Sequence, residues 1–269
     1  MDRGRGGVVI LEGLPGGGKT TCFHRFIAAY ANSDVLFLPE ANPPPWIDGL
    51  TPSLSGWLGS RYFQLIWEGR LAAMRWLRAA GHALLLDRSF FSNLAYLHAA
   101  KSSLYTVALD RFAKLYSLEN APNLLIVIDL PAELALERRQ RLEKLPVPWC
   151  LPDFIDRLRR FYRKILPTLL PCQIYFVPGE LPPDALWQAV LSLAGPVLPT
   201  PKQRSIPPVP PHGMTLLDNA ARTWRLGKSS APTIWQLGRP AKFFQRQAIW
   251  HSQTRGVERI PWHRPSLLK

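Results

Sequence analysis

The chain has 269 residues, of which 47% are hydrophobic, and this suits one α/β domain with a core plus an additional segment. No apolar run approaches the ~20 residues of a membrane helix. The N-terminal apolar stretch ends at Leu11, so we expect neither a membrane span nor a signal peptide and assign the protein to the cytoplasm. The three cysteines (Cys22, Cys150 and Cys172) fit no zinc or disulfide spacing.

The net charge of +14 is unevenly distributed. Residues 1–195 contain 21 Lys and Arg against 17 Asp and Glu, a net charge of +4. Residues 196–269 contain 12 against 2, a net charge of +10. The first part therefore has the charge of an ordinary enzyme that handles anions, whereas the second part carries most of the basic character.

Short apolar runs alternate with helical patterns along residues 1–195. The runs are rich in Leu, Val and Ile and predict strands at residues 8–11, 35–38, 83–86, 124–128 and 174–177. Helical patterns cover residues 21–31, 61–80, 104–118, 132–144, 153–170 and 183–194. This alternation predicts an α/β fold: a doubly wound, parallel five-stranded sheet between two helical layers, which is a three-layer sandwich.

The C-terminal part of the chain has a different composition. Residues 196–212 contain seven prolines and predict a linker. Residues 213–269 form a basic tail with no strong period and with Trp224, Trp235, Trp250 and Trp262. We expect this tail to be largely irregular, as an extension of a domain that spans residues 1–195.

A phosphate-binding loop lies between the first strand and the first helix. The sequence Gly13-Leu14-Pro15-Gly16-Gly17-Gly18-Lys19-Thr20 fits G-x-x-x-x-G-K-[ST]. Backbone N–H groups of such a loop surround phosphate oxygens, Lys19 reaches the β- and γ-phosphates, and the Thr20 hydroxyl holds Mg²⁺. The alternative is a glycine-rich turn that binds nothing. We expect ATP and Mg²⁺ as cofactors, and the nucleotide-binding residues are Gly13, Gly16, Gly17, Gly18, Lys19, Thr20 and Thr21.

Charged residues follow the predicted strands at the sheet edge where ligands bind in such folds. Glu40 follows the second strand and is placed to deprotonate a hydroxyl acceptor or hold a Mg²⁺-bound water, unless it is a solvated loop residue. Asp87 ends the third strand, where it would either bind Mg²⁺ together with Thr20 or cap the following helix. Arg88 would contact phosphate oxygens unless it lies on the surface. Asp129 ends the fourth strand at the same edge.

Two further groups are candidates for substrate contacts. Arg138 and Arg141 share a helix face in Glu137-Arg138-Arg139-Gln140-Arg141, and they would neutralise a transferring phosphoryl group or form a solvated basic face. Phe63 and Gln64 lie early in a long helix. Gln64 would read a base edge and Phe63 would stack on a ring, although an amphipathic helix needs aromatic residues for its core in any case.

These residues together resemble the thymidylate kinase and deoxynucleoside kinase superfamily of P-loop kinases, over roughly residues 7–194. The start of the phosphate-binding loop looks like that of a thymidylate kinase. The run from Asp87-Arg88-Ser89 through Ser92 to Ala95-Tyr96 is similar to its D-R-Y-x-x-S-x-x-A-Y segment. Phe63-Gln64 and Pro39-Glu40 look more like deoxynucleoside kinases, where the glutamate acts as base on the 5′-hydroxyl and the glutamine pairs with the nucleobase.

The resemblance implies roles for particular residues and has departures. It implies that Lys19, Glu40, Asp87, Arg88, Arg138 and Arg141 are catalytic and that Glu40, Phe63, Gln64, Arg88, Ser92 and Tyr96 bind the acceptor. Thymidylate kinases usually have an acid at the position of Pro15, Arg-Glu-Pro at Pro39-Glu40-Ala41, and Gln at the position of Leu97. The branch of the superfamily therefore stays open between nucleoside and nucleotide kinases.

Two functions from different classes fit the sequence. The first is a Mg²⁺/ATP kinase that acts on a small-molecule nucleoside or nucleoside monophosphate. The second is a P-loop ATPase that binds nucleic acid through the basic tail, because Lys and Arg neutralise phosphates and tryptophans stack on bases. A tail without a partner is the third alternative. Several members of the family are dimers, so the resemblance is compatible with a homodimer.

Overall fold

The five predicted strands form one parallel sheet in the computed structural model. The structure describes residues 6–31, 33–40, 52–116, 121–140, 151–170, 172–199, 234–236, 239–244, 247–252 and 256–259. The strands are β1 (Val8–Gly13), β2 (Val35–Leu38), β3 (Ala83–Asp87), β4 (Leu124–Asp129) and β5 (Gln173–Pro178). Their order is β2-β3-β1-β4-β5 and every pairing is parallel. The predicted fold class is therefore confirmed.

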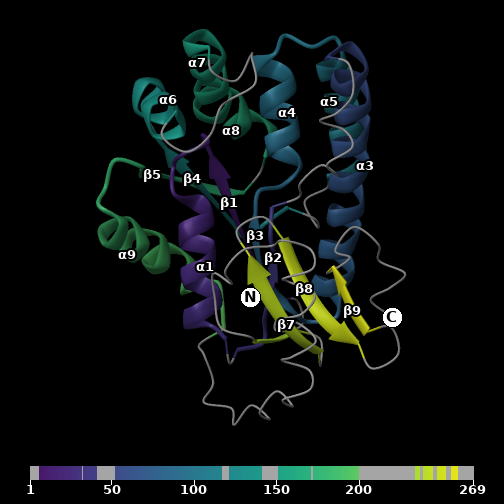
Figure 1. Ribbon diagram of the computed structural model, residues 1–269, viewed down its shortest axis with the longest axis vertical. Coiled ribbons are helices and arrows are strands. Elements are labelled where there is room, and N and C mark those ends of the chain that lie inside the picture. Colours follow the sequence, from purple (N-terminus) through teal and green to yellow (C-terminus); the bar gives the residue numbers. More distant parts are fainter. Residues whose placement is uncertain are drawn as a thin grey trace.

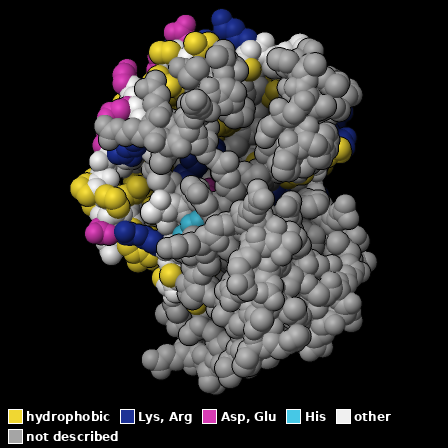
Figure 2. Space-filling view, viewed as in Figure 1, with side chains coloured by type: hydrophobic (Ala, Val, Ile, Leu, Met, Phe, Trp, Pro, Cys, Tyr) yellow, Lys and Arg dark blue, Asp and Glu magenta, His cyan; other side chains and the backbone are white. Residues whose placement is uncertain are grey.

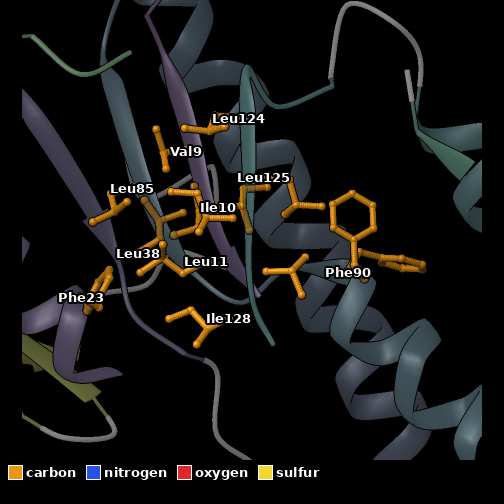
Figure 3. Packing of buried hydrophobic residues seen from close by; sticks show 14 of the residues in the cluster. Val9, Ile10, Leu11, Phe23, Leu38, Leu85, Phe90, Leu124, Leu125 and Ile128 are labelled. Atoms are coloured by element: carbon orange, nitrogen blue, oxygen red, sulfur yellow. The ribbon is translucent and has the colours of Figure 1, made fainter. Parts of the chain in front are cut away.

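The central strands are buried over their whole length, which explains why they read as continuous apolar runs. Every residue of β1, β3 and β4 is buried. Figure 3 shows Ile10 and Leu11 of β1 packed between neighbouring strands, with Leu85 of β3 and Leu125 of β4 among the surrounding side chains. β1 lies in the middle of the sheet, so the loop that follows it emerges between the ends of β3 and β4.

Helices cover the sheet in two layers (Figure 1). α1 (Lys19–Ala29) and α9 (Pro183–Ala194) pack against each other, and they contact β1, β3 and β5. α3 (Pro52–Ala79), α4 (Phe90–Ala99) and α7 (Pro152–Arg160) form the other layer, joined by α5 (Leu104–Leu115) and α6 (Ala132–Gln140). After α7 the chain continues into a π-helical turn, Phe161–Ile165, and α8 (Leu166–Leu169).

Two helical predictions differ from the structure. The segment predicted as one helix over residues 153–170 contains the π-turn, in which one residue more than an α-helical turn is accommodated. The helix predicted to begin at residue 61 begins at Pro52, a residue that is favourable in the first helical turn. Among the described residues, no helix has the length and apolar content to cross a membrane.

The described residues of the C-terminal tail contain regular structure. They form an antiparallel sheet of β6 (Ile234–Gln236), β7 (Arg239–Phe244), β8 (Gln247–Ser252) and β9 (Gly256–Arg259). Consecutive strands pair with each other, and only two or three residues separate them. Such short strands give no long periodic signal, which is why the sequence did not reveal them. Residues 200–212 of the predicted linker lie outside the described residues, as do Trp224 and Trp262.

Candidate active site

The phosphate-binding loop turns sharply at the end of β1, and glycine is required there. Gly13 has a φ of 125°, and a Cβ atom at this position would lie 2.2 Å from the carbonyl oxygen of Ile128 in β4. Gly18 has a φ of 93° and is the residue before the first turn of α1. The loop therefore passes between β4 and α1 with its backbone at a helix N-terminus, which is the arrangement that binds phosphate groups.

Lys19 is buried beneath this loop. Its Nζ atom donates a hydrogen bond of 2.7 Å to the carbonyl oxygen of Leu14, and the residue is only 4% exposed. Burial, followed by the positive charge of Arg88, lowers the pKa of Lys19 to about 7 against the opposing effects of Asp87 and Glu40. The ammonium group is thus held at the loop in a position to meet phosphate oxygens.

Thr20 and Asp87 meet across the sheet edge. The Thr20 hydroxyl donates a hydrogen bond of 2.9 Å to Oδ2 of Asp87, whereas the buried Oδ1 has no hydrogen-bond partner. Burial, followed by the negative charge of Glu40, raises the pKa of Asp87 to about 6, although Lys19 and Arg88 act in the opposite direction. The predicted alternative, Asp87 as the cap of α4, is wrong because Ser89 is the N-cap and accepts from the Phe91 amide.

This pair fits a magnesium ion that is shared with a nucleotide. A free carboxylate oxygen next to a hydroxyl supplies two hard oxygen ligands, and Mg²⁺ is ordinarily held by one or two protein groups together with phosphates and water. Among the described residues no cluster of three His, Cys, Asp or Glu side chains is suited to a metal ion.

Arg88 forms an ion pair with Glu40 at the same edge. Its Nε atom lies 2.6 Å from Oε1 of Glu40, and its side chain is 7% exposed while that of Glu40 is 34% exposed. Burial opposes the charge of Arg88, but Glu40, Tyr96, Tyr162 and Glu12 together outweigh it, so the pKa of Arg88 is raised well above its usual value. Nη1 donates to the Gly13 carbonyl at 3.4 Å and to the Ser92 hydroxyl at 3.1 Å. The surface alternative for Arg88 is thus wrong.

Arg70 of α3 joins the ends of two strands, and the sequence analysis missed it. Its guanidinium donates to the carbonyl oxygens of Pro39, Leu38, Asp87 and Arg88. Burial lowers its pKa to about 10 against the attraction of Asp87 and Glu40. Because these carbonyls flank Glu40 and Asp87, Arg70 fixes the distance between the two acids. Its signal in the sequence is a charge on the apolar face of α3 that also carries Trp67 and Met74.

Glu12 is a second residue that sequence reasoning left without a role. It is fully buried at the end of β1. One carboxylate oxygen accepts from the backbone N–H and the hydroxyl of Ser89, at 2.8 and 2.7 Å. The other accepts from Ser92 at 2.6 Å and from the Tyr162 hydroxyl at 2.9 Å. An acid inside an otherwise apolar strand is the signal that would have identified it.

Of the predicted arginine cluster, the structure places Arg138 beside the loop. Its Nη1 donates to the carbonyl oxygens of Gly16, at 3.3 Å, and Gly179, at 2.8 Å. Arg141 lies outside the described residues, as does the side chain of Arg139. Figure 2 shows Lys and Arg side chains over the α6 and α7 region, with Asp and Glu side chains beside them.

Asp129, at the end of β4, is held by Arg159 of α7 and Arg163 of the π-turn. Arg159 donates to both of its oxygens at 2.9 Å, and Arg163 donates to Oδ2. Burial acts to raise the pKa of Asp129, but the hydrogen bonds from Arg159 and Arg163 prevail and lower it to about 2. We call the pairing of Asp129 with Arg159 and Arg163 the clasp. The backbone N–H of Gly179 donates to the Asp129 carbonyl oxygen, so the clasp also fixes the loop at Gly179 that Arg138 contacts.

The remaining candidates have the following surroundings. Tyr96 is half-buried, with its ring centroid 5.9 Å from the guanidinium carbon of Arg88. Phe63 packs against the core, which agrees with the alternative that it serves as a core residue of an amphipathic helix. Gln64 donates to Glu68 at 3.2 Å, and Glu68 pairs with Arg111 at 2.9 Å. Thr21 is exposed in the first turn of α1.

The arrangement can position a phosphorylated donor and a hydroxyl or phosphate acceptor. The loop, Lys19 and the helix N-terminus present positive charge to one anion. Arg88 and Glu40 lie on the other side of Asp87, where an acceptor would meet an acid and a guanidinium. Phosphoryl transfer depends mostly on such positioning and charge neutralisation.

Comparison with known proteins relates the chain to nucleotide kinases. No family model matches it. It is 27% identical over 180 residues to a probable thymidylate kinase of Metallosphaera sedula, covering 62% of this chain and 86% of the relative. It is 29% identical over 166 residues to a thymidylate kinase of Xanthomonas oryzae pv. oryzae, covering 58% of this chain and 71% of the relative.

A solved structure shares the fold. It is that of the deoxyadenosine kinase of M. mycoides, with dCMP and a flexible dCDP bound, and it matches with a TM-score of 0.56 at 11% identity. The match covers 71% of this chain and 100% of that structure.

Proposed function

We propose that this chain, which belongs to the thymidylate kinase and deoxynucleoside kinase superfamily of P-loop kinases, transfers the γ-phosphoryl group of ATP to a nucleoside or nucleoside monophosphate. The similarity to thymidylate kinases indicates a nucleotide kinase. The donor, the acceptor and the roles of the residues are what we propose. The observation that carries it is the position of Thr20, Asp87, Arg88 and Glu40 at one edge of the sheet, directly after the phosphate-binding loop.

The donor side of the site uses the loop. Backbone N–H groups of the loop and Lys19 would hold the triphosphate. Arg138 donates to the Gly16 carbonyl oxygen and would thereby fix the loop next to the phosphates. Thr20 and the free Oδ1 of Asp87 would hold Mg²⁺. When bound, the metal neutralises and orients phosphate oxygens.

The acceptor side uses the ion pair. Glu40 is the group that would accept the proton of an attacking hydroxyl, because it is the more exposed partner and faces the edge where Arg88 is fixed. Arg88 would neutralise the transferring group or hold the phosphate of a monophosphate acceptor. Phe63, Gln64, Ser92 and Tyr96 are proposed to lie along the acceptor, and Arg141 is proposed to act with Arg138 on the transferring group.

The test is ADP release from ATP with a panel of nucleosides and nucleoside monophosphates. Lys19→Ala should abolish turnover with every acceptor that the wild type uses, whereas Lys101→Ala, at an exposed position, should leave it unchanged. If no member of the panel stimulates ADP release by the wild type, the assignment is wrong. The panel also decides between nucleoside and monophosphate acceptors.

The cytoplasmic location, the homodimer and weak binding of nucleic acid by the tail stay predictions. The alternative function, a nucleic-acid-associated ATPase, rests on residues 196–269, whose described part is limited to four short strands and residues 196–199. Deleting residues 200–269 distinguishes the two functions, because a kinase site formed by residues 7–194 should keep its turnover in the truncated protein.

A further inference from the structure

We propose that Glu12 is a positioning residue that holds Arg88 in its working geometry. The inference rests on the proposed function, because it assigns Glu12 to the same site, but it has a readout that does not need turnover. Glu12 is fully buried behind the site and accepts from the side chains of Ser89, Ser92 and Tyr162.

The backbone of Arg88 is the first reason. Its φ of 65° is in the left-handed region, which is strained for a residue with a Cβ atom. The next amide, that of Ser89, donates to the Glu12 carboxylate at 2.8 Å. A charge-assisted hydrogen bond at this peptide stabilises the turn that points the Arg88 side chain toward Gly13 instead of along the strand.

The side chain of Arg88 is the second reason. Ser92 donates to Glu12 and accepts from Nη1 of Arg88, so the carboxylate orients the hydroxyl whose lone pair the guanidinium uses. Glu40 holds Nε from the opposite, more exposed side. Arg88 is thus fixed by one acid that faces the substrate and by a second acid that is shielded from it.

A link to the next helical segment is the third reason. Tyr162 lies in the π-turn, and its hydroxyl donates to Glu12 at 2.9 Å. The same segment carries Arg159 and Arg163 to Asp129. The wider π-turn allows Tyr162 to face β1 while the two arginines face the end of β4. Glu12 therefore ties this segment to Arg88 through a single carboxylate.

Glu12→Gln tests the idea with little change in volume. The fixed N–H of Ser89 requires an oxygen, so the new NH₂ group must face Ser92 and Tyr162. It would compete with Arg88 for the Ser92 lone pairs. We expect kcat to fall by at least about tenfold while KM for ATP changes by less than about twofold, because the phosphate-binding loop is not altered.

Coupling to Arg88 separates positioning from general stability. In the Arg88→Ala background, Glu12→Gln should lower kcat by less than about threefold, since the group that it positions is absent. Equal fold-losses in both backgrounds would overturn the proposal. Arg157→Gln is the matched control, because Arg157 joins α7 to the Ala99 carbonyl of α4 at 2.7 Å without touching Glu12. It should lower Tm and leave kcat unchanged.

The exchange rate of the Arg88 Nε–H proton, measured by NMR and assigned through its loss in Arg88→Lys, gives the readout without turnover. It should rise at least about tenfold in Glu12→Gln and in the smaller change Ser92→Ala, and not in Arg157→Gln. Unchanged exchange in both of the first two variants refutes the positioning role even if the enzyme turns over. Faster exchange in an enzyme that no acceptor stimulates refutes the kinase assignment and leaves the positioning role standing.

Discussion

Replacing Asp87 by Asn is expected to stabilise the empty protein and to abolish its Mg²⁺-dependent turnover. Asp87 is 1% exposed, and its Oδ1 has no partner. Burial is the main reason that its pKa is raised from 3.8 to about 6. The folded state therefore binds more protons than the unfolded state between about pH 4 and pH 6, and the stability of the wild type falls as the pH rises through this window.

The size of the effect follows from the two pKa values. A difference of about two pH units between them corresponds to about 3 kcal/mol of folding stability, which is lost by pH 7, when the carboxylate is ionised. Asn keeps an oxygen for the Thr20 hydroxyl, which donates at 2.9 Å in the wild type. For a domain of this size we expect Tm at pH 7 to rise by several degrees, about 2–4 °C for each kcal/mol.

Thermal melts without nucleotide at pH 5 and pH 7 measure this. The difference in Tm between the two pH values should shrink in Asp87→Asn. Asp110→Asn, at an exposed carboxylate, should behave like the wild type. Thr20→Val should lower Tm, because Asp87 would lose its donor and keep its charge. A less stable Asp87→Asn protein at pH 7, or an unchanged pH dependence, would refute the reasoning.

Three further predictions concern the loop and its surroundings. Because burial lowers the pKa of Lys19 to about 7, ATP binding above pH 7 should take up a proton and weaken as the pH rises; calorimetry at pH 8 in two buffers of different ionisation enthalpy checks this, and no proton uptake would contradict it. Gly13→Ala should unfold at a much lower temperature than Gly17→Ala, because the new Cβ would lie 2.2 Å from the Ile128 carbonyl oxygen at a φ of 125°, against 3.2 Å from the Leu14 carbonyl oxygen for Gly17; similar melting temperatures would show the reasoning to be wrong. Arg159→Ala and Arg163→Ala should each be tolerated while the double variant loses more stability than their sum, because either arginine alone leaves Asp129 paired; additive losses in urea titrations would argue against the shared clasp.

The fold was predictable because its central strands are buried on both faces. β2 was predicted with its observed bounds, and the other predicted strands lie within the observed ones. α4 was not predicted as a separate helix, since Phe90, Phe91 and Leu94 are buried together with most of its other residues and no polar face gives a 3.6-residue period. The π-turn was missed because one added residue does not disturb the pattern of a segment of this length.

The site was predictable only where a residue follows a strand or belongs to the phosphate-binding loop. Thr20, Asp87, Arg88 and Glu40 meet because parallel strands bring their carboxyl ends to one edge. Arg70 was missed because its partners are backbone carbonyl oxygens, which leave no trace in the side-chain sequence. Tyr162 lies 150 residues from its partner Glu12, and the sequence contains no short-range pattern that connects them.

The buried charges of the site explain why a ligand should be bound tightly at this edge. Lys19, Asp87, Arg88 and Arg70 are all less than 7% exposed, and burial opposes the charge of each one. Among the described residues, no ion pair joins Lys19 to a carboxylate in the way that Glu40 pairs with Arg88, and its ammonium group donates to the carbonyl oxygen of Leu14. Asp87 has one free oxygen. The proposed triphosphate and divalent cation would supply the opposite charges that both groups lack, so their binding would offset the desolvation that folding has already imposed. Of these four groups, Lys19 and Asp87 are the two whose pKa values burial brings close to pH 7, to about 7 and about 6, and they are the two proposed to face the donor. Asp87→Asn and the proton uptake of Lys19 measure this property independently.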